Sequence, residues 1–172
     1  MKRFGVAVVG ALLACTVVGS ASAQILHNGQ HEVIRQQDSI QRFDVVTGTG
    51  YQIGTATGPI AGTTYVAFHY TITGGPGTDG ALPVSFNNKV LITDIDGDQL
   101  SFDNDGTGRF HAGFPGDPFQ GTGGPMIGTY VLTSGTGKYS SLPVGTQLAY
   151  RAVFTNPPNG ALGNVYVELT AR

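Results

Sequence analysis

The residues best suited to chemistry are five aspartates within the stretch 93–106, "TDIDGDQLSFDNDG". They are Asp94, Asp96, Asp98, Asp103 and Asp105. A calcium loop needs carboxylates at alternating positions beside a glycine, and Asp94, Asp96 and Asp98 have that spacing. Counting from the first aspartate, Gln99 stands where an EF-hand loop needs glycine, and an aspartate stands where it needs a bidentate glutamate. The sequence therefore matches a calcium loop only in part.

Turn chemistry accounts for the same aspartates without a metal. Asp96 and Gly97 predict a two-residue hairpin, because a type I′ turn needs positive φ at both central positions. The residues "NDG", 104–106, predict a second turn, which would leave Leu100 and Phe102 on one face of a short strand between the turns. On this interpretation the acidic residues are solvated turn residues at one rim of the fold, and a calcium site is the alternative.

The elements that must position these residues are predicted to be strands. Short runs of β-branched and aromatic residues alternate with glycine-rich turns, and no window has helical periodicity at helical length. The predicted strands are 42–49, 51–57, 63–73, 83–93, 98–103, 107–111, 127–133, 146–155 and 164–170. Eight or nine strands at this spacing predict a sandwich or a barrel. With 27 glycines, 9 prolines and 40% hydrophobic residues, the composition is that of a folded all-β protein.

Aromatic residues at strand positions are candidates for lining the interior. In the strand 63–73, Phe68 and Tyr70 share one face, which places His69 on the other, outward face. No partner that would make His69 catalytic is visible in the sequence. The candidates for lining a ligand-binding lumen are Phe68, Tyr70, Phe86, Tyr150 and Phe154. Plain core packing is the alternative for each of them, because side chains alone can fill an eight-stranded barrel.

The last two predicted strands allow a prediction of register. Their apolar faces agree when Phe154 pairs with Val165, and a one-residue slip would turn one of those faces outward. That register places Arg151 directly opposite Glu168. We expect the two side chains to form an exposed cross-strand ion pair, which contributes less than about 1 kcal/mol to stability.

The first residues predict export. Lys2 and Arg3 precede an apolar run that ends in an Ala-x-Ala site, which predicts a signal peptide cleaved after Ala23 and a secreted or periplasmic protein. This run is too short to span a bilayer, so we expect no transmembrane helix. The tetrapeptide "LLAC" resembles a bacterial lipobox. The alternative to cleavage after Ala23 is therefore a protein anchored by a lipid on Cys15.

The predicted domain organisation is a signal peptide (1–23), a polar flexible leader (24–40) and a β-barrel domain (41–172). Cleavage after Ala23 leaves 149 of the 172 residues, which is the usual size of one domain. Without Cys15 that chain has no cysteine, and therefore no disulfide and no thiolate nucleophile.

Charge and motifs exclude several functional classes. Removing the two basic residues of the signal peptide from the nine in the chain leaves seven against 11 acidic residues, which does not suit a nucleic-acid-binding protein. The glycine-rich segment "SGTGKY" (134–139) ends in Tyr139, where a phosphate-binding loop needs Ser or Thr to hold magnesium. We therefore expect no cofactor.

Three segments resemble a known family in order and spacing. "GTYVLTSGTGKYSSLPVGTQL" (128–148) resembles the Gly-x-Tyr-x-Ile-x-Gly-Gly-Thr-Gly signature of the allene oxide cyclase barrel-like family, relatives of the plant dirigent proteins. "DGDQLSF" (96–102) resembles its Gly-Asp-x-Leu strand, and "GTATGPIAGTTYVAF" (54–68) its early hairpin. Ser134 replaces a glycine of the signature, and "SSLPVG" is one residue longer than the family's segment and contains Pro143.

The resemblance implies a single eight-stranded antiparallel β-barrel of calycin-like architecture, whose lumen can hold a small apolar ligand, and which can assemble as a homo-oligomer, a trimer or a dimer. No position matches the functional residues of the plant cyclases, so their activity does not transfer. We expect a secreted, non-enzymatic barrel that binds a small apolar or aromatic ligand in its lumen or acts as an extracellular interaction module. The alternatives are a cofactor-free cyclase, isomerase or dirigent-like protein, and a calcium-stabilised extracellular module.

Overall fold

The computed structural model describes residues 33–44, 46–110, 122–155 and 163–171. The predicted signal peptide, with Cys15, and the first part of the predicted leader lie outside the described residues. No helix in the described segments has the length and apolar character needed to cross a membrane.

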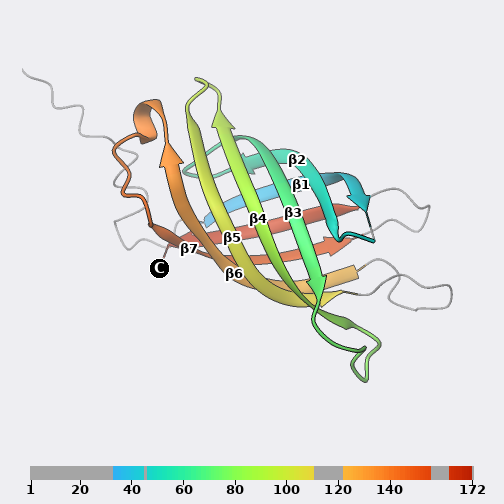
Figure 1. The fold of residues 1–172 in the computed structure, drawn as a ribbon. Helices are drawn as coiled ribbons and strands as arrows, with labels where there is room; N and C mark the ends of the chain where they lie inside the picture. The colour runs from blue at the N-terminus through green and yellow to red at the C-terminus, as the bar shows by residue number, and fades with distance from the viewer. Residues whose placement is uncertain (1–32, 45, 111–121, 156–162, 172) are drawn as a thin grey trace, which may run out of the picture.

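The strands form a closed antiparallel barrel, in which each strand pairs with its neighbours in the sequence and the last pairs with the first (Figure 1). They are β1 (Val33–Asp44), β2 (Thr49–Thr57), β3 (Gly62–Ile72), β4 (Leu82–Asp94), β5 (Gln99–Phe110), β6 (Thr122–Gly135), β7 (Gln147–Thr155) and β8 (Asn164–Ala171). A short 3-10 helix, η1 (Gly137–Tyr139), lies between β6 and β7. The prediction of an eight-stranded barrel is confirmed, and the sandwich alternative is wrong.

The predicted register of the last two strands is also confirmed. In β7 and β8, Phe154 pairs with Val165, and Arg151 lies opposite Glu168. The expected ion pair is different, because Glu168 pairs instead with Arg35 on its other neighbour, β1, with 3.8 Å between Nε and Oε1. Glu168 therefore lies between two arginines and contacts the one on β1.

The structure corrects the prediction of a flexible leader at 24–40 and of a first strand at 42–49. Residues 33–40 are the first part of β1, which pairs with both β2 and β8 and completes the barrel. The inward positions of this strand include Gln36 and Asp38, both buried. Because polar residues occupy the inward face, the sequence lacks the apolar alternation that marks a strand.

The structure also corrects the predicted turn at 104–106. β5 is continuous from Gln99 to Phe110, and Asn104 is a fully buried residue within it. Gly106 reflects close packing against β6, since a Cβ at this position would lie 2.2 Å from the carbonyl oxygen of Ile127. Asp103, on the same strand, is thus a strand residue and not a rim residue.

The interior has two halves of different character. At the end where β4 connects to β5 and β6 to β7, Ile60, Tyr139 and Leu142 cap the core from the connecting segments and are each at most 6% exposed. The strand residues beneath them are aliphatic: Ile34, Ile92, Leu100, Leu132, Leu148 and Leu169. Toward the other end aromatic rings dominate, and Phe43 and Tyr70 there are only partly buried. A small molecule would therefore meet an aromatic surface at the second end.

Candidate functional site

Four of the five candidate lining residues lie in the barrel interior and form a connected series of rings. Ring centroids are 5.1 Å apart for Phe68 and Tyr70, 6.0 Å for Tyr70 and Phe86, and 5.6 Å for Phe86 and Tyr150. Tyr130, which is not among the predicted lining residues, extends the series by stacking on Tyr150 at 5.3 Å. The side chain of the fifth candidate, Phe154, lies outside the described residues.

Glycines on the inward faces make room for these rings. Gly106 pairs with Phe86 across β4 and β5, and Gly128 pairs with Tyr150 across β6 and β7. A Cβ at Gly106 would lie 2.5 Å from Cζ of Phe86. The Phe86 side chain therefore extends over Gly106, as aromatic residues do when they cover a glycine on a neighbouring strand.

A buried carboxyl group lies beside the rings. Asp38 is 1% exposed, and its two oxygens accept hydrogen bonds from the Gln36 amide and the Thr64 hydroxyl. Burial raises the pKa of Asp38 above its ordinary value of 3.8, and the hydrogen bonds from Thr64 and Gln36 oppose that rise. Gly54, which pairs with Asp38, leaves the space that the carboxyl occupies, since a Cβ there would lie 2.4 Å from Oδ1.

The interior tyrosines belong to the same network. The Tyr130 hydroxyl donates to Oε1 of Gln36 at 3.4 Å, and the Tyr70 hydroxyl is hydrogen-bonded with Gln52. Burial is the main cause that raises the pKa of Tyr70, Tyr130 and Tyr150, and the nearby charge of Asp38 adds to it. The hydroxyl groups therefore keep their protons at neutral pH.

A second buried polar pair joins β4 to β5. The Asn88 amide donates to Oδ1 of Asn104 at 2.8 Å, and Asn104 donates in turn to the carbonyl oxygen of Thr129 at 3.3 Å. Oδ1 of Asn88 is buried and has no hydrogen-bond partner among the described atoms. A buried acceptor without a partner is unusual, because leaving it unpaired costs about 1–3 kcal/mol.

The polar residues of this interior site are not among those predicted from the sequence. The signal that could have identified them is alternation: Gln36 and Asp38 lie two residues apart on β1, and Asn88 continues the inward series of Phe86 on β4. Together with the rings, they provide an aromatic surface that also carries hydrogen-bond donors and acceptors out of contact with water. Such a surface is suited to hold a planar apolar molecule, and a carboxyl group of raised pKa is suited to move a proton.

The aspartates of the β4–β5 turn surround a lysine. Oδ1 of Asp94 accepts the backbone N–H groups of Asp96 and Asp98, at 2.9 and 3.0 Å. The Lys138 ammonium group lies 2.6 Å from Oδ2 of Asp94 and 3.0 Å from Asp96. A turn forms here, but the predicted two-residue type I′ turn is wrong: Gly97 has a φ of +87°, whereas no non-glycine residue of the described segments, Asp96 included, has a positive φ. The N–H of Asp94 instead donates to the carbonyl oxygen of Asp98 at 3.0 Å, which closes a loop of three residues.

The other two aspartates lie on the outer face of β5, away from that turn. Asp103 pairs with Lys89 at 2.7 Å, and Asp105 accepts a hydrogen bond of 2.5 Å from Asn87. The structure thus divides the five predicted metal ligands between a turn and a strand face. In the described part of the chain, no group of three or more His, Cys, Asp or Glu side chains is arranged to hold a metal ion.

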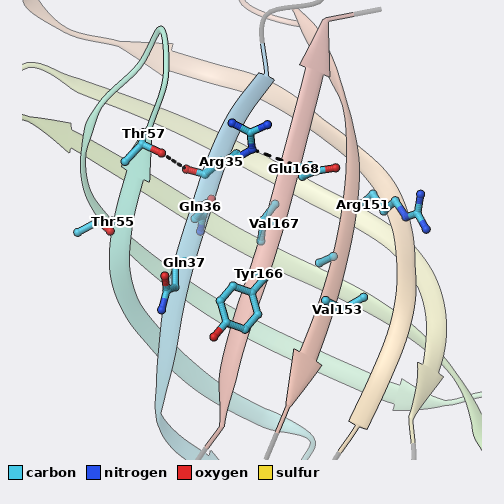
Figure 2. A pocket seen from close by; sticks show the side chains of 11 residues that line it. Arg35, Gln36, Gln37, Thr55, Thr57, Arg151, Val153, Tyr166, Val167 and Glu168 are labelled. Atoms are coloured by element: carbon cyan, nitrogen blue, oxygen red, sulfur yellow. Dashed lines mark hydrogen bonds and ion pairs between the residues drawn. The ribbon is translucent and has the colours of Figure 1, made fainter.

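A groove of about 460 Å³ lies on the outside of the barrel, across β2, β1, β8 and β7. Figure 2 shows the side chains of Arg35, Gln37 and Tyr166 along it, and the contact of Arg35 with Glu168. Tyr166 is 43% exposed. The groove combines an aromatic ring with charged and amide groups, and it is separate from the interior rings.

Comparisons of the chain with protein-family models, with curated proteins and with solved structures find no match.

Proposed function

We propose that this protein is a secreted or periplasmic β-barrel of the allene oxide cyclase barrel-like type, with calycin-like architecture, that binds a small aromatic or otherwise apolar molecule in its lumen without a cofactor. Export through the predicted signal peptide, with a lipid on Cys15 as the alternative, belongs to the same proposal. The "GTYVLTSGTGKYSSLPVGTQL" segment and its two companion segments support the family assignment.

One observation carries the proposal: aromatic rings and polar groups converge in the interior. A core whose only role is packing is best built from apolar side chains, because each buried polar group must be paired or costs free energy. Here the rings of Phe86 and Tyr150 lie in the same interior as buried Asp38 and the unpaired oxygen of Asn88. An apolar site with a few convergent polar groups and a shifted pKa is the usual form of a small-molecule site.

Native mass spectrometry of the protein from its own host tests the proposal, followed by mild denaturation to release bound molecules. We expect a reproducible released mass, and we expect the neutral dye N-phenyl-1-naphthylamine to bind the emptied protein. Tyr70→Phe removes an interior hydroxyl and should lower occupancy, whereas Tyr65→Phe removes one from an exposed tyrosine and should not. A clean apo mass without dye binding would show a filled barrel that acts through its surface.

The same native mass counts the chains in the assembly, for which we propose a dimer or a trimer. It also shows whether the mature chain begins at Gln24 or at a lipidated Cys15. Both of these outcomes are independent of whether a ligand is bound.

A second candidate function is a cofactor-free isomerase or cyclase, and the buried Asp38 favours it. A carboxyl group whose pKa is raised by burial holds a proton more readily than an ordinary carboxyl group and can accept and return one, while the tyrosine hydroxyls donate hydrogen bonds to a developing negative charge. Any released molecule should then be incubated with the protein and with Asp38→Asn. Turnover by the first and not by the second, with equal binding by both, would make the protein an enzyme; binding without turnover would make it a carrier.

A further inference from the structure

The outer groove is built from two parallel rows of outward-facing residues. In the first row, Arg35 of β1, Glu168 of β8 and Arg151 of β7 lie directly opposite one another. The second row crosses the same three strands: Tyr166 of β8 lies directly opposite Gln37 of β1 on one side and Val153 of β7 on the other. Residues two positions apart on one strand are about 7 Å apart, so each member of the second row lies about that far from its neighbour in the first.

The first row carries an excess of positive charge. Two guanidinium groups flank one carboxylate, in a chain whose net charge is −2. Arg35 and Glu168 are 3.8 Å apart, which is long for an ion pair, and their side chains are 70% and 59% exposed, respectively. Ion pairs as exposed as this contribute little to stability. In Figure 2 the Arg151 side chain points away from Glu168. The groove therefore holds arginine donors that the single carboxylate does not use.

The second row supplies an apolar surface of the size of one ring. Tyr166 is 43% exposed and Val153 is 44% exposed, and they are direct neighbours across β7 and β8. Gln37 lies beside Tyr166 on the other side and offers an amide. Thr55, paired with Gln37, adds a hydroxyl at the β2 edge.

We propose that this groove binds a molecule in which a carboxylate is attached to a ring. The ring lies over Tyr166 and Val153, and the carboxylate reaches Arg151, whose planar guanidinium can hold both carboxylate oxygens. The roughly 7 Å between the two rows is the length of one ring with its attached carboxylate. An aromatic acid and a sugar acid share this chemistry, and the groove volume of about 460 Å³ accommodates either. This site lies outside the barrel and does not depend on the lumen binding a ligand.

Titrations followed by two-dimensional 1H–15N NMR test the proposal, with 4-hydroxybenzoate and D-glucuronate as probes and their neutral counterparts 4-hydroxybenzamide and D-glucose as controls. At least one acid should shift the amide signals of Val153 and Thr55, on the outer face, and leave that of Phe86 unchanged. Tighter binding of 4-hydroxybenzoate would indicate that the ligand is an aromatic acid, and tighter binding of D-glucuronate would indicate a sugar acid. Its affinity should exceed that of its neutral counterpart by about tenfold or more and should fall as salt is added.

Variants of exposed residues locate the carboxylate. Arg151→Gln should weaken binding of the acid by about tenfold or more, and Tyr166→Thr should remove the contribution of the ring. Arg42→Gln is the matched control, because Arg42 is exposed on β1 but does not line the groove. Equal loss in Arg151→Gln and Arg42→Gln, equal binding of acids and neutral counterparts, or no shift at the outer-face amides would each overturn the proposal.

Discussion

The rings of Phe86 and Tyr150 meet across the barrel interior, with centroids 5.6 Å apart and planes at 63°, although β5 and β6 separate their strands. The row that joins them is Phe86, Gly106, Gly128 and Tyr150, each residue paired with the next. Because the two middle positions carry no side chain, both rings can lean inward until they touch. The two glycines therefore leave the space in which the rings of Phe86 and Tyr150 make contact.

Gly106→Ala should destabilise the barrel by about 1–3 kcal/mol, the usual cost of overpacking a core. The added Cβ would lie 2.2 Å from the Ile127 carbonyl oxygen and 2.5 Å from Cζ of Phe86, so both backbone and ring must move. Urea denaturation measures the loss. Gly75→Ala is the control, since a Cβ there would meet nothing within 4 Å. Equal effects of the two substitutions would contradict this account.

The parts of the fold that the sequence predicted are those in which apolar and polar residues alternate with the correct face inside. Leu148, Tyr150 and Ala152 on β7 all point inward, and so do Val165 and Val167 on β8. Only one register of β7 against β8 places both of these apolar faces inside, and the structure has that register.

The wrong predictions of a leader at 33–40 and of a turn at 104–106 share one physical cause, which is that this barrel buries polar residues. Asp38 on β1 and Asn104 on β5 are interior residues, yet each belongs to a residue type that marks leaders and turns. Asp38 has one partner on its own strand, Gln36, but its other partner, Thr64, lies on β3, and the partner of Asn104, Asn88, lies on β4. The interior site could not be predicted because it depends on these non-local pairings.

The Asp94–Lys138 pair should stabilise the fold at all but acidic pH. The hydrogen bond from Lys138 holds the pKa of the Asp94 carboxyl group at about 2, below the ordinary value of 3.8. A carboxyl group whose pKa is lower in the folded state stabilises the fold above its unfolded-state pKa, and this contribution disappears as the pH falls through the folded-state value. The Tm advantage of the wild type over Asp94→Asn should therefore shrink between about pH 4 and pH 2. An advantage that stays constant over that range would contradict the assignment.

Calcium should leave the Tm of the wild-type protein unchanged. The Lys138 ammonium group already lies against Asp94 and Asp96, so a calcium ion would have to displace it. Thermal unfolding with and without calcium chloride measures the effect, since a ligand that binds only the folded state raises Tm. A rise in the wild type that disappears when Asp96 and Asp98 are both replaced by Asn would instead support the calcium-stabilised module.

Asp38 should make the fold less stable as the pH rises from acid toward neutral. Because burial raises its pKa above 3.8, the unfolded chain loses this proton at lower pH than the folded chain does. The contribution is therefore most favourable at or below the unfolded-state pKa, declines as the pH rises toward the folded-state pKa, and is constant above it. Asp38→Asn cannot ionise, so its unfolding free energy minus that of the wild type should increase from pH 3 to pH 7 in urea denaturation. Gln37→Ala, on the outward face next to it, should give a difference that does not vary with pH. A pH-independent difference for Asp38→Asn as well would mean that the carboxyl group ionises equally in the folded and unfolded chain, and it would remove the proton-transfer role proposed for the interior site.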